Sequence, residues 1–402
     1  MQEISEPSSE RDGPDRDLGL KELGYVEEAI RSGVLNSTQG VFVNRLEMAF
    51  AFRVGQKSAV ACSSGSAALH AAYAVAGLDS GDEVVTTPVT DMGALMPILY
   101  EGAVPVFCDV DPLTGNVTAA AIEAQMTDRT RAVVVTHLFG MPCDVEEILE
   151  LVRSRDVLLI EDCAQAALAE GASGPVGSTG DLACYSFQQS KHMTTGEGGI
   201  LTTNDDELHR LARKFINKGW GYGEDEPDHD QPGLNYRMTE LQGAVGLAQL
   251  ENLDAVVDRR RQAAARFLEA LGSLPGVAAP LVGDDVIHSY WRMPLMIDPE
   301  IICGGPDAVA HELEERGLRS YPRYIQKPAF SCAVFEEWAR FPLLRRAYEA
   351  AARTPPPSMA EFPGVASFLS RVLVLPWSEE YSQVDVDEIV ALLREICVDA
   401  QL

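Results

Sequence analysis

The sequence predicts an α/β protein in which helices cover a mostly parallel sheet. Short runs of branched apolar residues alternate with segments whose apolar residues recur at helical spacing, such as EEILELVRSR at 146–155. Parallel strands need such helical connections between them. A long helical pattern at 239–271 ends the alternation. The strand candidates lie at 83–88, 104–109, 132–137, 157–161, 182–187 and 199–203.

A second, smaller α/β unit is predicted after the long helix. Turn-forming residues in SLPGVAAPLVGDD indicate a boundary near 272–285. Further elements of both types follow this boundary. They are the strand candidates WRMPLMID and VLVLPW, helices near 306–317 and 385–397, and a proline-rich loop at 354–363.

We therefore divide the chain into three parts. Residues 1–16, which are charged and contain proline, are expected to be a disordered tail. Residues 17–271 form the predicted large domain, and residues 272–402 form the small one. A length of 402 residues fits two domains of ordinary size.

The composition excludes several classes of protein. The formal net charge of −29 argues against nucleic-acid binding, which depends on Lys and Arg side chains that neutralise phosphates. No apolar stretch is long enough to span a membrane, and the N-terminus is unlike a secretory signal, so a soluble, cytoplasmic protein is expected. The eight cysteines are scattered without a CxxC pair, so neither a zinc site nor a disulfide framework is predicted.

Lys191 is the first candidate catalytic residue. It lies in SFQQSKHMTTGEGG, between a short apolar strand and a glycine-rich turn. A lysine attacks an aldehyde only when its amine is partly neutral, and burial lowers its pKa towards that state. A solvated lysine in a surface loop is the alternative interpretation.

An acid and an amide follow a neighbouring strand candidate. The segment VLLIEDCAQA at 157–166 resembles a buried strand that ends at Glu161 and Asp162, with Gln165 three residues further on. Ligands of α/β sheets gather at this carboxyl end, where Asp162 could hold a pyridine nitrogen protonated and Gln165 could reach a ring oxygen. The alternative for Asp162 is an ordinary helix N-cap.

Two further segments carry polar groups before helical patterns. In ACSSGSAALHAAYAVAGL at 61–78, serines and Gly65 precede an alanine-rich helix, which suits either an anion site or a simple N-cap. In NYRMTELQ, Thr239 is the expected N-cap of a helix. Asn235 and Arg237 lie just before it, and Asn235 on its own is typical of a turn.

Taken together, these segments resemble the DegT/DnrJ/EryC1/StrS family of sugar aminotransferases, which have pyridoxal phosphate fold type I. The resemblance covers the chain from about residue 20 to its end, and its strength lies in the order of the motifs. The motifs are SSGSAAL, GDEVVTTP, VPVFCDVDP, THLFGMPCD, IEDCAQA, GDLACYSF, the lysine with TTGEGG, and NYRMTELQ.

The resemblance implies a role for each matching residue. Lys191 would bond covalently to pyridoxal phosphate and move protons, Asp162 would pair with the pyridine nitrogen, and Gln165 would touch the ring oxygen. The loop with Asn235 and Arg237 would reach the active site of the other subunit, which implies a homodimer. The phosphate would be held by Gly65, Ser66, Ala67 through its backbone amide, and Ser186.

One position departs from the family pattern. Family members usually place an aromatic ring on the face of the cofactor a few residues after GDEVVTTP, whereas this chain has Asp91 there. An aspartate cannot stack on a pyridine ring. Asp91 therefore either contacts cofactor or substrate in another way, or is a loop or capping residue.

The substrate contacts are less clearly indicated. An anionic substrate would need a local basic patch in so acidic a protein. Arg237, His192, Tyr321 and Lys327 are the substrate-site candidates, although His192 also fits a structural role. Further basic candidates, each with a solvated surface charge as its alternative, are Arg213, Lys214, Lys218, Arg319 and Arg323.

The function implied is transfer of an amino group from glutamate or glutamine to a nucleotide-linked keto-sugar or a keto-cyclitol, in secondary-metabolite or polysaccharide biosynthesis. Some relatives carry histidine in place of the lysine and act as dehydratases, and this chain has the lysine. An eliminating or aromatising enzyme, such as an aminohydroxybenzoate synthase, is the main alternative. A regulatory protein and a nucleotide-binding dehydrogenase are disfavoured, the latter because no GxGxxG turn follows the first strand.

Overall fold

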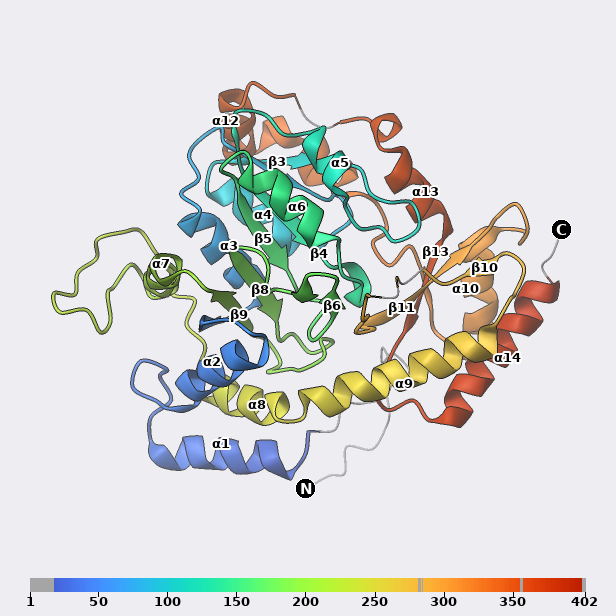
Figure 1. Cartoon of the computed structure of the whole chain (residues 1–402), viewed down its shortest axis with the longest axis horizontal. Helices are drawn as coiled ribbons and strands as arrows, with labels where there is room; N and C mark the ends of the chain where they lie inside the picture. Colours follow the sequence, from blue (N-terminus) through green and yellow to red (C-terminus); the bar gives the residue numbers. More distant parts are fainter. Residues whose placement is uncertain (1–17, 281–282, 284, 355–356, 400–402) are drawn as a thin grey trace.

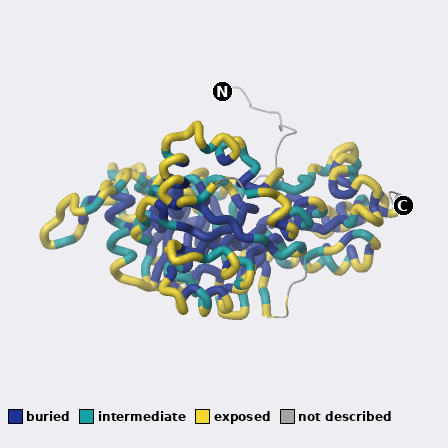
Figure 2. Tube along the Cα trace, turned by 90° about the horizontal axis from the view of Figure 1, so that it is seen from above, coloured by how far each residue is buried: buried dark blue, intermediate teal, exposed yellow. Residues whose placement is uncertain are grey.

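The computed structural model describes residues 18–280, 283, 285–354 and 357–399. Two sheets lie side by side, with helices on the outside of each (Figure 1). The buried backbone runs through the middle of the molecule and the exposed segments surround it (Figure 2). The predicted tail at 1–16 lies outside the described residues. No helix within them is long and apolar enough to cross a membrane.

The larger sheet has seven strands in the order β1-β9-β8-β5-β4-β2-β3. β9 is antiparallel to both of its neighbours, and every other pair in the sheet is parallel. The predicted mostly parallel sheet is thus confirmed. Its strands are β1 (Ser58–Cys62), β2 (Glu83–Thr86), β3 (Val104–Phe107), β4 (Thr130–Thr136), β5 (Leu158–Asp162), β8 (Leu182–Ser186) and β9 (Gly199–Thr203).

Both faces of this sheet are buried. Along β1, Val60 and Cys62 pack into one apolar core, whereas Ala59 and Ala61 pack into another, because successive strand residues point to opposite faces. The covering helices are α1 (Leu20–Ser32), α2 (Phe42–Arg53), α3 (Gly65–Val75), α4 (Met92–Tyr100), α5 (Ala119–Glu123), α6 (Val145–Arg153), α7 (Asp206–Ile216) and α8 (Glu240–Leu250).

The second sheet has four antiparallel strands in the order β10-β11-β13-β12. These strands are β10 (Val277–Ala278), β11 (Arg292–Ile297), β12 (Tyr321–Pro322) and β13 (Val372–Pro376), and a separate hairpin joins β6 (Glu170–Gly171) to β7 (Gly174–Pro175). The remaining helices are α9 (Leu253–Leu271), α10 (Gly305–Glu315), α11 (Ala333–Glu336), α12 (Pro342–Ala350), α13 (Pro363–Arg371) and α14 (Gln383–Asp399). Single 3₁₀ turns lie at Leu138–Gly140, Ala329–Ser331, Trp338–Arg340 and Met359–Glu361.

Helix α9 connects the two sheets. Leu253 and Val257 pack into a core of the larger sheet, whereas Phe267 and Leu271 pack into the core of the second sheet. Figure 1 shows α9 running from α8 to α14. Side chains from 329–351 and 362–369 also pack against the first core. The domain division at 271/272 stays a prediction.

The six strand candidates of the first sheet and the two of the second are found in the structure, but two expectations are corrected. The helix predicted over 239–271 is two helices, because the chain turns at Glu251 and Asn252. Asn favours such breaks because its short polar side chain can form the hydrogen bonds with nearby backbone groups that the helix would otherwise use. The edge strand β1 was missed, because small residues in SAVAC lack the branched side chains typical of strands.

Arg260 of α9 ties this helix to the ends of two strands of the second sheet. Its buried guanidinium donates to the backbone carbonyls of Trp291 (3.2 Å) and Trp377 (2.7 Å), and it forms an ion pair with Glu379 at 2.6 Å. Burial lowers the pKa of Arg260, and Glu379 opposes that effect. One side chain thereby fixes the residue before β11 and the residue after β13 against α9.

We expect Arg260→Leu to lower the free energy of unfolding by about 3 to 5 kcal/mol, because the buried carboxylate of Glu379 would lose its ion pair with the guanidinium. Urea unfolding followed by circular dichroism measures this change. Arg260→Leu combined with Glu379→Leu should recover part of the loss. An unchanged midpoint in the single variant would contradict the assigned role.

Candidate active site

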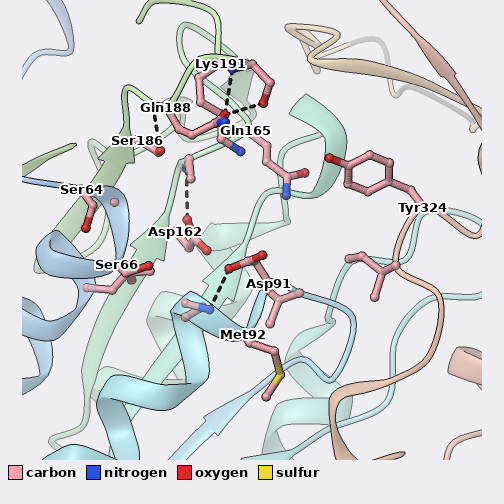
Figure 3. Close-up of a pocket in the computed structure, with 18 of the residues that line it drawn as sticks. Ser64, Ser66, Asp91, Met92, Asp162, Gln165, Ser186, Gln188, Lys191 and Tyr324 are labelled. Carbon is pink, nitrogen blue, oxygen red and sulfur yellow. Dashed lines mark hydrogen bonds between the residues drawn. The ribbon is translucent and has the colours of Figure 1, made fainter. Parts of the chain in front are cut away.

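A cavity of about 730 Å³ opens where the carboxyl ends of the parallel strands face the second sheet. Figure 3 shows side chains from several segments around this space, with Asp162 in the middle, Lys191 on one side and Asp91 on the opposite side. Ser66 and Ser186 lie towards α3, and Tyr324 enters from the loop after β12. The lining therefore combines both halves of the chain.

Lys191 lies in the turn after β8, where its N–H donates to the carbonyl of Gln188 at 2.9 Å. Its Nζ atom is 3.9 Å from the centre of the Trp291 ring. Burial lowers the pKa of Lys191 to about 8, and Asp162 and Asp91 oppose this shift. The amine is thus neutral in a substantial fraction of molecules at mildly alkaline pH.

Asp162 is the last residue of β5 and is 5 % exposed. Its Oδ1 accepts a hydrogen bond from the N–H of Ala164 at 3.1 Å. Burial raises the pKa of Asp162, and the charge of Lys191 only partly opposes that effect. A cationic N–H placed in the cavity would therefore stabilise its carboxylate.

A buried network supports the strand end behind Asp162. His137 Nδ1 accepts from the N–H of Cys143 at 3.0 Å, so its Nε2–H donates to Glu161, also at 3.0 Å. Burial raises the pKa of Glu161, but hydrogen bonds from His137, Gly180 and Gly177 outweigh it and leave the value low. Cys163 completes a cluster of metal-ligand type, yet both ring nitrogens already have partners. We attribute this cluster to hydrogen bonding.

Gln165 points into the cavity, and the carbonyl oxygen of its side-chain amide is already hydrogen-bonded. Its Oε1 accepts from the N–H of Phe139 at 2.7 Å, which leaves the NH₂ group as a donor towards bound molecules. Phe139 has a φ of 57°, a left-handed conformation that is uncommon outside glycine. Its ring stacks on Trp291 at a centroid distance of 6.4 Å. Gln165 therefore presents its NH₂ group to the cavity and also holds the backbone of Phe139, whose ring supports Trp291.

The N-terminus of α3 faces the cavity beside β8. Ser64 is its N-cap, and Ser64 Oγ accepts from the N–H of Ala67 at 3.0 Å. The N–H groups of Gly65 and Ser66 precede the first helical hydrogen bonds and are available to an anion. A Cβ atom on Gly65 would lie 2.8 Å from Cβ of Ser186, so glycine permits this close approach. A phosphate contact from the amide of Ala67 would require its present bond to open.

Asp91 is an N-cap that also borders the cavity. Its Oδ1 accepts from the N–H of Gly93 at 2.7 Å and begins α4. The side chain is exposed, and its negative charge raises the pKa of Asp162. The capping alternative thus describes its local role, and a contact with cofactor or substrate stays a prediction.

The other predicted site residues are dispersed. Lys327 lines the cavity, whereas Asn235 is exposed outside it and Arg237 donates to Asn217. His192 is 1 % exposed and bonds through Nε2 to the carbonyl of Ser289 at 3.0 Å, which favours the structural alternative, and its substrate contact stays a prediction. Tyr321 also lies outside the lining, because its ring packs edge-on against Tyr324 at 5.6 Å.

Three of the further basic candidates form ion pairs with acidic residues of the chain. Lys214, for example, lies 2.7 Å from both Glu224 and Asp230. The other pairs are Arg213 with Glu47 and Arg323 with Asp307. These cations neutralise local acids and are not directed at the cavity.

Trp291, Arg292 and Tyr324 are among the lining residues that the sequence did not predict. WRMPLMID was recognised only as a strand, and nothing in its pattern indicates which cavity its first residues reach. An aromatic residue next to an arginine at a strand start is the one local signal. Trp291 and Arg292 are placed by the bond between Trp291 and Arg260 of α9, and Tyr324 is placed by the loop after β12.

A family comparison identifies the fold. The model of the DegT/DnrJ/EryC1/StrS aminotransferase family matches residues 17–394, and the chain belongs to that family. The match confirms the predicted family, the fold class and the aminotransferase activity.

Individual relatives agree with this assignment. GDP-perosamine synthase of Caulobacter vibrioides is 34 % identical over 404 residues, covering 98 % of each chain. A putative L-glutamine:3-amino-2,3-dideoxy-scyllo-inosose aminotransferase of Streptoalloteichus tenebrarius is 34 % identical over 343 residues, covering 82 % of this chain and 80 % of the relative. The crystal structure of the aminotransferase TlmJ from Streptoalloteichus hindustanus is 30 % identical, with a TM-score of 0.82, covering 95 % of this chain and 97 % of that one.

The low pKa of Lys191 predicts how the protein reacts with an aldehyde. Only the neutral amine attacks, so the rate of covalent uptake of pyridoxal phosphate should rise with pH and level off above about 8. Stopped-flow absorbance on cofactor-free protein, between about pH 6 and 10, measures this profile. A midpoint near the ordinary lysine value of about 10.4 would contradict the burial of the amine.

Proposed function

We propose that the protein binds pyridoxal phosphate and transfers an amino group from glutamate or glutamine to a keto-sugar or keto-cyclitol. The observation that carries this proposal is a lysine with a pKa of about 8 that shares a cavity with the buried carboxyl of Asp162. An ordinary surface lysine would keep a high pKa and would not face an enclosed acid.

The cavity fits this cofactor in chemistry and in shape. The raised pKa of Asp162 signals a carboxyl that lacks a cationic partner, and a protonated pyridine nitrogen is such a partner. The NH₂ group of Gln165 suits a ring oxygen, and the α3 N-terminus with Ser66 and Ser186 suits a phosphate. The close approach of Gly65 to Ser186 shapes the floor of that anion site.

Each residue then has a defined task. When bound, the cofactor supplies an aldehyde for the amine and a ring that withdraws electrons from the substrate carbon. Asp162 would hold the ring nitrogen protonated, and Gln165 would orient the ring. Lys191 Nζ would take a proton from the donor carbon and return it at the cofactor carbon, and its moderate pKa suits both directions.

The substrate class follows from the relatives. One acts in GDP-perosamine synthesis and another is named for a scyllo-inosose substrate, so nucleotide-linked keto-sugars and keto-cyclitols are both candidates. A role in secondary-metabolite or polysaccharide biosynthesis accords with either class. We retain both classes as acceptors to be tested.

We further propose a cytoplasmic homodimer whose subunits share their active sites. In a single chain Asn235 is exposed and lies outside the lining of its own cavity, a position compatible with reaching the cavity of a second subunit. The loop is anchored nearby, since Tyr236 accepts at its carbonyl from the N–H of Ser63 at 2.8 Å.

Amino transfer should depend on both Lys191 and Asp162. With glutamine or glutamate that carries ¹⁵N at the α-amino group, mass spectrometry should detect the label in an aminated keto-sugar or keto-cyclitol. Lys191→Ala should abolish the label, and Asp162→Asn should lower the rate by at least about 100-fold through loss of electrostatic stabilisation. A dehydrated product without label would instead favour the eliminating enzyme.

The shared site predicts complementation between two inactive variants. Co-expressed Lys191→Ala and Asn235→Ala chains should form mixed dimers in which one of the two sites is intact, which recovers about a quarter of the wild-type activity. Each variant alone is the control. Activity that stays at the level of the separate variants would contradict a site built from two chains.

A further inference from the structure

Arg292 is a buried cation in the cavity with no role in the scheme above. It begins β11, is 3 % exposed and lines the cavity. Its Nε atom is buried without a hydrogen-bond partner, and among residues 18–280, 283, 285–354 and 357–399 no ion pair joins it to a carboxylate. A buried charge without a counter-ion is strongly unfavourable, so its presence in the cavity calls for an explanation.

The position of Arg292 is held by aromatic rings. Its guanidinium carbon lies 5.0 Å from the centre of the Trp291 ring and 5.7 Å from that of Tyr324. Contacts of this type stabilise a guanidinium without neutralising it. The ring of Trp291 is the same ring that Lys191 Nζ approaches at 3.9 Å. The amine and the guanidinium therefore share one wall of the cavity.

The neighbouring charges leave Arg292 in need of an anion. The charge of Arg292 lowers the pKa values of Lys191 and Arg260, so three like-charged groups lie close together, and Arg260 is already paired with Glu379. The acids that act on Lys191 are Asp162 and Asp91, of which the first suits the ring nitrogen and the second caps α4. A ligand carboxylate would supply the missing charge.

We propose that Arg292 binds the α-carboxylate of the amino donor. This inference rests on the proposed function. In an amino acid the α-carboxylate and the reacting amine are attached to the same carbon, so a carboxylate beside Arg292 brings the amine to the position of Lys191. The diphosphate of a nucleotide-linked sugar is separated from its carbonyl by the sugar ring and fits this short spacing less well.

The test compares two donors that differ only in which carboxyl group is an amide. Glutamine keeps its α-carboxylate, and isoglutamine has an α-amide and a side-chain carboxylate. The loaded enzyme is mixed with each donor, and loss of the cofactor's aldehyde absorbance gives the first half-reaction. Wild type, Arg292→Gln, Arg292→Lys and the exposed control Arg345→Gln, which lies outside the cavity, are measured alike.

We expect wild type to prefer glutamine, and Arg292→Gln to lower its second-order rate constant by about 10- to 100-fold while isoglutamine changes little. The rate constant of Arg292→Lys with glutamine should lie between those of wild type and Arg292→Gln, and that of Arg345→Gln should match wild type. An unchanged rate with glutamine in Arg292→Gln overturns the proposal, as does an equal loss for both donors. If Arg292→Gln does not load the cofactor, an Arg292→Lys variant that matches wild type with both donors overturns it equally.

Failure of the proposed function can be told apart from failure of the Arg292 proposal. A loaded wild-type enzyme that converts neither glutamate nor glutamine contradicts that function. Calorimetric titration with α-methylglutamate, which has no α-proton to lose, then tests the carboxylate site by itself. Weaker binding to Arg292→Gln than to wild type supports the site, and equal binding overturns it.

Discussion

The active site depends on holding one amine, Lys191 Nζ, against the ring of Trp291 and within the field of Asp162. The lysine comes from the turn after β8, the acid from the end of β5, and the ring from the start of β11. Burial by the ring lowers the pKa of the amine, and the two acids keep it from falling further. A reactive lysine thus requires both sheets to be in place.

The contacts that join the two sheets therefore also position the reacting groups. Arg260 fastens the residues before β11 to α9, and Phe139 stacks on Trp291 from the side of the larger sheet. Gln165 holds Phe139 through its backbone while presenting a donor to the cavity. The same few contacts therefore determine the stability of the junction and the position of the reacting groups. A change at Arg260 is expected to reach Lys191 through Trp291.

Six strands of the larger sheet, together with the positions of Lys191, Asp162 and Gln165 at its edge, could be predicted because their signals are local. A branched apolar run followed by polar residues identifies the end of a parallel strand whatever surrounds it. Trp291 and Arg292 could not be predicted, since they reach the cavity through pairing of β11 with β13 and packing on α9.

Asp91 was ambiguous because a capping aspartate and a cavity aspartate have the same sequence pattern. The sequence left two roles open for His192, because adjacency to Lys191 does not determine which way its side chain points, and its bond to Ser289 favours the structural one.

The most direct test of this account is to find which lysine carries the cofactor. The chain has only six lysines, so borohydride reduction of the loaded enzyme followed by peptide mass spectrometry can examine each one. The account predicts a pyridoxyl phosphate adduct on Lys191 in near-stoichiometric amount and none on the other five. An adduct mainly on another lysine, or no adduct on a protein that has bound the cofactor, would contradict it.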